Sequence, residues 1–351
     1  KRWAMRAPRA ATQHQRGRHQ PGRLPLMLAA WRLTHMRKPP SSLTVRRMNR
    51  LLLEEWEVRY DDTTVLSPED RRSTYVREQI WRNTAKTSLR VGVVDRGAAD
   101  CAAFVGPDGS LSLETPRALE APCPRPRVDV VLALPAPFRL KKMLPLVSML
   151  GVERLVLAGT DRVDRAYFGG TLLRGLPRYS RRVASFADAT GDLRSLLVQG
   201  AEQAGATALP KIALTESLGV ALAAVDDVAF KLAGHPARRG DVKALADVVR
   251  HAKPRDRAVL VVGPDRGFEE PDELDLLRKT HGFHLCTLRG GLAARALRTD
   301  VALIALLSSL HEALDTAAAD DSVLPFETAA KDDDESSTVV PPAGVVVAAQ
   351  S

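Results

Sequence analysis

The sequence predicts an α/β domain built on a parallel sheet, preceded by a smaller β-rich domain. Three observations support this: five short apolar runs in the second half of the chain, helical patterns between them, and a proline-rich linker where the composition changes. Apolar runs that do not alternate with polar residues are typical of parallel strands covered on both faces. With 351 residues, 45% of them hydrophobic, the chain is long enough for two cores.

The first predicted domain covers residues 48–121 and is rich in short strands. Apolar runs at 88–95 and 101–114 predict a hairpin, in which 107–109 (Pro-Asp-Gly) supply strong turn residues. A helical pattern fills about 68–82. We expect Ser67 to cap this helix, because its hydroxyl can accept a hydrogen bond from a first-turn N–H group, and Pro68 to occupy the first helical position.

A linker and the α/β domain follow. The sequence APCPRP at 121–126 predicts the linker, because prolines continue neither a helix nor a sheet interior. We place the α/β domain at 127–314. Its predicted strands are the apolar runs 128–134, 154–159, 211–214, 258–263 and 283–288. The alternating charges at 161–165 predict a solvated loop after the second of these strands.

The last predicted helix, 301–314, is apolar on nearly every side as far as Leu307. Such a helix is expected to be buried all round. At the structured end of a chain, a helix of this kind often packs against a second subunit. The sequence therefore predicts a dimer, with an identical or a different partner, through 301–314.

Charge is distributed unevenly. The formal net charge is +9, but residues 1–47 contain twelve Lys or Arg and no Asp or Glu, while 315–351 contain eight acids and one lysine. The acid-free arm is typical of a mitochondrial transit peptide, and the alternative is a basic RNA-binding arm of a cytoplasmic protein. The acidic segment has low complexity and adds little to the fold.

Several function classes find no support in the sequence. The three cysteines form no C-x-x-C pair, and His281 and His284 have no third ligand nearby, so we expect no metal site. The phosphate-loop, G-x-S-x-G and G-x-G-x-x-G patterns are absent. No apolar run approaches the roughly twenty residues needed to span a bilayer, so we expect no membrane partner.

The most informative stretch begins where a predicted buried strand runs into 263–268, Gly-Pro-Asp-Arg-Gly-Phe. Glycines at a strand end let a ligand approach the backbone closely and reach its N–H groups. After the next predicted strand come a glycine-rich loop at 289–291 and the run 295–300, Arg-Ala-Leu-Arg-Thr-Asp. A strand followed by glycine is common, so it is the joint occurrence of the two motifs that predicts a ligand site.

These motifs resemble one branch of the SPOUT class of RNA methyltransferases, which methylates ring nitrogen 3 of a uridine in small-subunit ribosomal RNA. That family carries a Gly-Pro-Glu-Gly-Gly-Phe loop and a Leu-Arg-Thr-Glu-Thr-Ala run. Residues that match or nearly match are Gly263, Pro264, Gly267, Phe268, Arg295, Leu297, Arg298, Thr299, Asp300 and Ala302. Weaker similarities at 48–55, 149–152 and 201–205 extend the resemblance over about 48–314.

The resemblance implies a fold and a function. The β-rich domain would be a PUA-like RNA-binding barrel, and the α/β domain a trefoil-knotted SPOUT domain that binds S-adenosylmethionine (SAM) and dimerises. The activity would be SAM-dependent methylation of a ribosomal RNA uridine during ribosome biogenesis, in the mitoribosome if residues 1–47 direct import. The expected partners are ribosomal RNA and a ribosomal precursor particle.

Site residues follow from the two motifs. Deprotonation of the uridine ring spreads negative charge onto two carbonyl oxygens, which an arginine fork can stabilise. Arg295 and Arg298 are the catalytic candidates for this role. The cofactor-binding candidates are Leu260, Val262, Gly263, Pro264, Asp265, Gly267, Phe268, Leu288, Leu292, Leu297 and Thr299.

The chain also departs from the family pattern. Asp265 stands for the loop glutamate and Arg266 for the glycine after it, Met149 replaces a glutamate, and Ala206 replaces an arginine. The lysine-rich start of the first helix becomes Ala-Pro-Phe at 136–138. These changes support an alternative from another class, a ribosome assembly factor that binds rRNA without turnover. A third possibility is an α/β enzyme that acts on another small molecule.

Overall fold

The computed structural model describes residues 50–59, 62–81, 88–114, 118–122, 124–179, 185–237 and 241–321. The predicted basic arm lies outside the described residues. So does the predicted acidic tail from residue 322 onward.

The first sheet has five strands in the order β1-β3-β4-β5-β2. Its strands are β1 (Leu51–Leu53), β2 (Thr63–Leu66), β3 (Ser88–Val93), β4 (Gly97–Val105) and β5 (Leu111–Glu114). All neighbours are antiparallel except β1 and β3. The predicted hairpin is confirmed: the Pro-Asp-Gly turn joins β4 to β5, and Gly109 adopts φ +87°, which favours glycine.

The helix of this first region begins later than predicted. Helix α2 (Arg71–Tyr75) is capped by Asp70, whose carboxylate accepts a hydrogen bond from the backbone N–H of Arg72 at 2.7 Å. Turn η2 (Val76–Ile80) continues it as a π-helix. The prediction of Ser67 as the cap and Pro68 as the first helical residue was therefore wrong, because a carboxylate three residues on takes the capping position.

The second sheet has eight parallel strands in the order β11-β13-β10-β12-β6-β7-β9-β8. The predicted runs correspond to β6 (Val128–Ala133), β7 (Val152–Ala158), β9 (Lys211–Thr215), β12 (Ala258–Val262) and β13 (His284–Thr287). The parallel α/β prediction is confirmed. The strands β8 (Arg178–Tyr179), β10 (Phe230–Gly234) and β11 (Lys243–Ala244) were not predicted.

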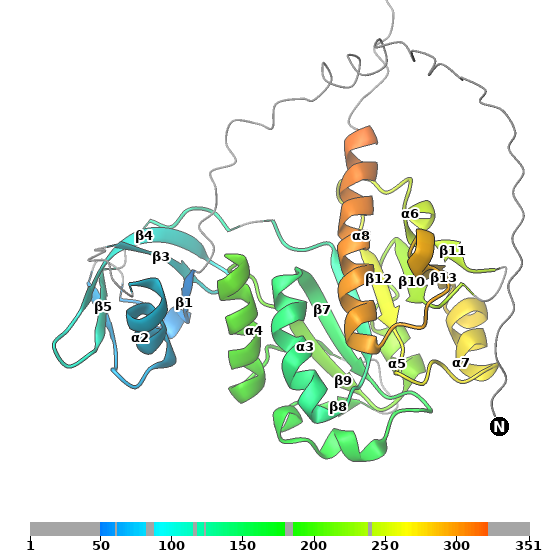
Figure 1. Ribbon diagram of the computed structural model, residues 1–351, viewed down its shortest axis with the longest axis horizontal. Helices are drawn as coiled ribbons and strands as arrows, with labels where there is room; N and C mark the ends of the chain where they lie inside the picture. The colour runs from blue at the N-terminus through cyan, green and yellow to red at the C-terminus, as the bar shows by residue number, and fades with distance from the viewer. Residues whose placement is uncertain are drawn as a thin grey trace, which may run out of the picture. The chain divides into compact units, whose positions relative to one another are not determined.

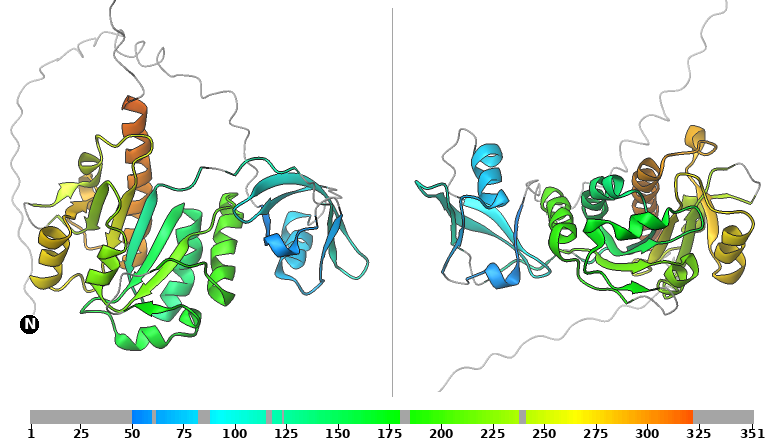
Figure 2. Two further views of the ribbon diagram at one scale, coloured as in Figure 1. Left: turned by 180° about the vertical axis from the view of Figure 1, so that it is seen from behind. Right: turned by 90° about the horizontal axis from the view of Figure 1, so that it is seen from below.

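Helices cover both faces of the parallel sheet (Figures 1 and 2). One core packs α3 (Pro137–Met149), α4 (Gly191–Ala204), α6 (Leu245–Val248) and α8 (Thr299–Asp321) onto one face. The other core packs α5 (Leu218–Ala223) and the α7 (Asp272–Asp275) region onto the opposite face. Neighbouring residues of one strand serve different cores, as Val130 and Val131 do, because strand side chains alternate between faces.

Helix α8 corrects two expectations. Leu303 and Leu307 are fully buried in the core, but Val301 is 46% and Ile304 38% exposed, so the helix is not buried all round in this chain. It also extends to Asp321, into the range predicted as tail. By length and composition Thr299–Ala319 could cross a membrane, which the sequence had not suggested, yet one side of it packs into the core.

Candidate active site

Two loops at the carboxyl ends of β12 and β13 enclose a cavity of about 400 Å³, called here the first cavity. Ten of the eleven predicted cofactor residues line it. They are Val262, Gly263, Pro264, Asp265, Gly267, Phe268, Leu288, Leu292, Leu297 and Thr299. The eleventh, Leu260, does not: it is fully buried within β12, where its side chain belongs to the core that packs against α3 and α8.

The glycines of the β12 loop have distinct physical roles. A Cβ on Gly263 would stand 2.9 Å from the ring of Phe268, which is itself buried, so the ring packs directly against the backbone. Gly267 adopts φ +73° and faces open space, with no atom within 4 Å of the position of a Cβ. Its N–H donates to the carbonyl of Pro264 at 2.8 Å, which closes the turn. This loop therefore presents backbone to the cavity.

Hydrogen bonds fasten the β12 loop to the start of α8. Thr299 donates its backbone N–H to Asp265 Oδ1 at 3.1 Å and its hydroxyl to the carbonyl of Gly263 at 3.1 Å. Arg139, from the first turn of α3, forms an ion pair with the other oxygen of Asp265. The aspartate at the family's glutamate position thus joins three segments, because its two oxygens accept from two of them.

The two predicted catalytic arginines are placed differently. Arg295 lines the first cavity, and its Nε donates to the carbonyl of Gly291 at 3.3 Å. Arg298 lies outside the first cavity. Its guanidinium makes two bonds of 2.6 Å to Asp300, and this pairing lowers the pKa of that carboxyl. The structure therefore brings Arg295 together with the other site residues. Arg298 is not among them, and its guanidinium instead donates two hydrogen bonds to the carboxylate of Asp300.

Sequence reasoning missed the residues that hold the loop in place. Arg162 donates to Glu269 Oε2 and to the carbonyl of Arg266, both at 2.6 Å. Glu273 is buried and accepts from the N–H groups of Asp161 at 2.8 Å and Glu269 at 2.7 Å. The charged residues of the predicted loop at 161–165 are exposed as expected, but the contacts of this loop with 269–273 were not predicted. No sequence motif connects 161–165 with 269–273, because these two segments are far apart in the chain and come together only when it folds.

Cys286 also lines the first cavity. Burial raises the pKa of its thiol to about 12, so it stays protonated near neutral pH. A protonated thiol is a poor nucleophile, so we assign Cys286 a packing role in the cavity wall. Across the described residues, no group of three or more His, Cys, Asp or Glu could hold a metal ion.

A second cavity, of about 660 Å³, lies at the carboxyl ends of β6 and β7. It shares a wall with the first cavity, and the residues common to both are Arg162, Pro264, Asp265, Arg266 and Thr299. Arg266 is exposed on this wall. The first cavity keeps its volume with the Arg266 side chain present, so the replacement of glycine leaves room for a ligand.

Comparison with known proteins identifies the family. Residues 121–311 match the model of the RNA methyltransferase domain. The chain belongs to that family. It is 25% identical over 268 residues to the ribosomal RNA small subunit methyltransferase E of Treponema pallidum, which covers 74% of this chain and 88% of the relative.

Solved structures share the fold of this family member. The small subunit methyltransferase E of Neisseria gonorrhoeae, bound to SAM, superposes with a TM-score of 0.53 at 19% identity, over 76% of this chain and 98% of that one. A Legionella pneumophila structure in complex with SAM gives a TM-score of 0.53 at 20% identity, with the same two coverages. The shared span is longer than the matched domain, so the likeness in fold extends beyond residues 121–311.

Two departures from the family pattern lie away from both cavities. Met149 ends α3 just before the amino end of β7, and Ala206 follows α4, where its N–H donates to the carbonyl of Ala201 at 2.9 Å. Neither residue lines the first or the second cavity. The loss of polar groups at these positions therefore leaves both cavities intact.

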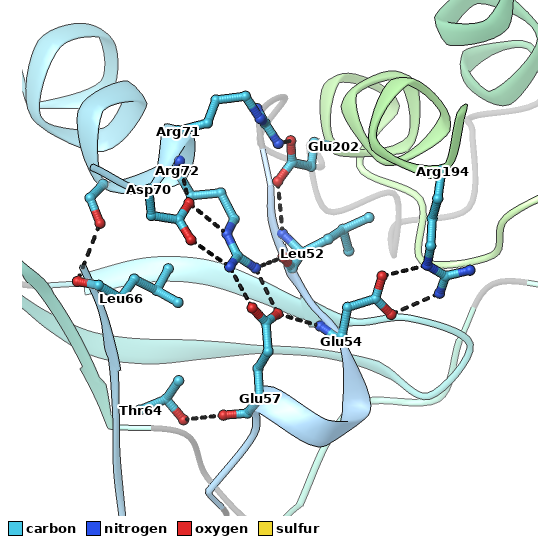
Figure 3. A network of polar contacts seen from close by, with 11 residues as sticks. Leu52, Glu54, Glu57, Thr64, Leu66, Asp70, Arg71, Arg72, Arg194 and Glu202 are labelled. Atoms are coloured by element: carbon cyan, nitrogen blue, oxygen red, sulfur yellow. Dashed lines mark hydrogen bonds and ion pairs between the residues drawn. The ribbon is translucent and has the colours of Figure 1, made fainter. Parts of the chain in front are cut away.

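Helix α4, which ends just before Ala206, contacts the β1 strand (Figure 3). Glu202 of α4 accepts from the N–H of Leu52 at 3.1 Å and from Arg71 at 2.8 Å. Arg194, also on α4, holds Glu54 through two bonds of 2.5 and 2.7 Å (Figure 3). Helix α4 thus links the parallel sheet to the five-stranded sheet by charged and backbone hydrogen bonds.

Proposed function

We propose that this chain transfers the methyl group of SAM to ring nitrogen 3 of a uridine in small-subunit ribosomal RNA during ribosome biogenesis. The observation that carries the proposal is the first cavity, in which two glycine-bearing loops gather ten predicted cofactor residues at the carboxyl ends of β12 and β13. Membership of the RNA methyltransferase family supports the reaction class. The name of the Treponema relative supports the substrate class.

The residues present fit SAM. A cavity of about 400 Å³ lies within the range of small-molecule sites, roughly 300 to 1,000 Å³. Apolar side chains such as Leu288 and Leu292 suit a flat heteroaromatic ring, and the open space beside Gly267 admits a ligand against the backbone. The charged lining is mixed, with the carboxylates of Asp265 and Glu270 beside three arginines, so the fit to SAM rests on the volume, the apolar side chains and the exposed loop backbone. When bound, SAM supplies a methyl group on an activated sulfonium.

The chain's own residues position the reaction. Arg162 holds the carbonyl of Arg266 and thereby fixes the wall between the two cavities. Arg295 lines the first cavity, where its Nε donates to the carbonyl of Gly291 and its guanidinium carries two further, terminal nitrogens. These terminal nitrogens can donate to the oxygens on which charge develops when the uridine loses its N3 proton.

The finer features of the family are also proposed for this chain. They are a trefoil knot in the α/β domain, a PUA-like barrel ahead of it, and a dimer through α8. The exposure of Val301 and Ile304 supports α8 as the dimer surface, with these two side chains in contact with the partner. The arginine-rich, acid-free arm at 1–47 supports a mitochondrial location.

The direct test is methyl transfer. Purified protein is incubated with methyl-labelled SAM and an unmodified small-subunit rRNA transcript, and the RNA is digested and analysed by mass spectrometry. We expect 3-methyluridine at one position. Methylation of another base, or of the ribose, would overturn the ring-nitrogen assignment but keep the reaction class. No transfer, with tight RNA binding, would support the second candidate.

That second candidate is an rRNA-binding assembly factor without turnover. Two observations favour it: an arginine stands at the family's glycine in the shared wall, and Asp300 occupies the fork of Arg298. Titration calorimetry with SAM separates the two candidates. An enzyme binds the cofactor in the first cavity, whereas a factor that has lost turnover together with its cofactor binds RNA alone.

A further inference from the structure

An exposed aromatic ring stands in the second cavity, and the proposed function gives it no role. Phe138, the second residue of α3, is 62% exposed and lines this cavity. The guanidinium carbon of Arg139 lies 5.6 Å from the centroid of its ring. Single exposed aromatic residues are common on protein surfaces. Phe138 differs from these in its position, because the cavity that it lines shares a wall with the first cavity.

The shared wall constrains where a methyl acceptor can lie. Methyl transfer needs the reacting atoms about 3 to 3.5 Å apart before reaction, so the acceptor base has to enter space that borders the cofactor. The second cavity borders the first along Pro264, Asp265 and Arg266. Its volume of about 660 Å³ is sufficient for a nucleotide.

The residues around Phe138 match the needs of an unpaired nucleotide. A base taken out of an RNA helix loses its stacking neighbours, and enzymes replace them with aromatic side chains. Arg266, in the same cavity, can pair with phosphate.

We propose that the second cavity receives the nucleotide to be methylated, unpaired from its RNA, and that Phe138 stacks on its base. The proposal rests on the proposed function, since it assigns the substrate of the same reaction. In this chain Phe138 belongs to the Ala-Pro-Phe segment that replaces the family's lysine-rich helix start. Recognition of the base thus rests on stacking against Phe138, and Arg266 supplies positive charge.

Kinetics with a matched control test the stacking role. Loss of one base–aromatic stack is expected to raise the KM for the rRNA transcript by about tenfold or more in Phe138→Ala. Phe138→Trp should restore it, and the dissociation constant for SAM should stay unchanged in both variants. The matched control is Phe138→Leu, which keeps an exposed apolar side chain at the same place without the aromatic ring and should show the raised KM of Phe138→Ala. Wild-type KM and kcat in Phe138→Ala would overturn the proposal.

A crosslinking experiment tests the placement without turnover. A transcript with 5-iodouridine in place of uridine is irradiated with the wild-type protein, and the attached peptides are mapped by mass spectrometry. We expect attachment at Phe138, and crosslinks exclusively to segments outside the second cavity would rule it out. A protein that crosslinks at Phe138 but transfers no methyl group would keep the binding site and contradict the proposed function, so the two failures are distinguishable.

Discussion

Thr299 donates its backbone N–H to the carboxylate of Asp265 at 3.1 Å, so the loop after β12 caps the first turn of α8. Asp265 precedes Thr299 by 34 residues in the chain. The contact therefore joins the two loops that enclose the first cavity. It gives a structural role to the residue that departs from the family's glutamate.

We expect Asp265→Ala to destabilise the protein and to weaken SAM binding. It removes the acceptor for Thr299 and the ion-pair partner of Arg139, and loss of a helix cap typically costs about 1 kcal/mol. Asp265→Asn keeps one acceptor oxygen and should retain most of the stability. Chemical denaturation and SAM calorimetry on both variants check this. Equal loss in the two would show that the charge, and not the cap, matters.

Arg266→Ala should leave SAM affinity within about threefold of wild type, since the first cavity keeps its volume beside the arginine. RNA binding should weaken, and the slope of log affinity against log salt should fall by about 0.7 to 0.9 if the variant neutralises one RNA phosphate fewer. Calorimetry and a salt titration measure the two effects. Markedly tighter SAM binding in the variant would instead identify the guanidinium as an obstruction.

Arg295 and Arg298 should differ in their effect on turnover. Arg295 lines the first cavity, so Arg295→Ala is expected to reduce kcat by about a hundredfold, the usual range for one transition-state donor. Arg298→Ala breaks an exposed pair with Asp300 and should reduce kcat less than threefold. Single-turnover methylation with each variant provides the comparison. A larger effect at Arg298 would place its side chain on the substrate.

The exposed and buried positions of α8 should respond differently to a charge. Ile304 is 38% exposed, so Ile304→Asp should yield folded protein, which is monomeric on sizing if α8 forms the dimer surface. Leu303 is fully buried, and Leu303→Asp should unfold the domain, because an unpaired buried charge costs several kcal/mol. Circular dichroism and light scattering separate unfolding from dissociation. An unchanged dimer in folded Ile304→Asp would exclude this surface.

Glu202 should make stability depend on pH. Burial raises the pKa of its carboxyl above the ordinary value of 4.5, although Arg71 pulls in the other direction. The folded state therefore binds a proton more tightly than the unfolded one, so this contribution is present below pH 4.5 and is lost as pH rises through the folded pKa. Glu202→Gln, which keeps an acceptor for Leu52, should gain stability relative to wild type as pH rises. Urea denaturation at several pH values measures it.

The sequence could predict the elements and sites that depend on local pattern. Strands such as β6 and β12 are continuous apolar runs, and the cofactor loops carry their glycines within a few residues of a strand end. Strand β10 was missed because it contains Lys231, which pairs with Asp226 and makes the run look polar. Leu260 was assigned to the site by proximity to the loop. It belongs to the same core as Val262, but it lies two residues further from the end of β12 and does not reach the cavity.

The second cavity could not be predicted, for a different reason. Its walls come from the start of α3, the loop after β7, Thr299 at the start of α8 and the loop after β12, segments that are far apart in the chain. Only the parallel arrangement, which brings the carboxyl ends of β6, β7 and β12 to one edge, places them together. The role of Arg162 was hidden in the same way, since its partners Glu269 and Arg266 lie in the last of these segments.

The common wall between the two cavities has a thermodynamic consequence. A ligand that rigidifies Pro264 to Arg266 from one side changes the free energy of binding on the other side, because the same backbone contributes to both. Linkage requires this effect to be mutual: the factor by which SAM changes the affinity for RNA equals the factor by which RNA changes the affinity for SAM. SAM loses its positive charge together with the methyl group. If RNA binds in the second cavity, we therefore expect its affinity to change on methyl transfer, through Pro264 to Arg266.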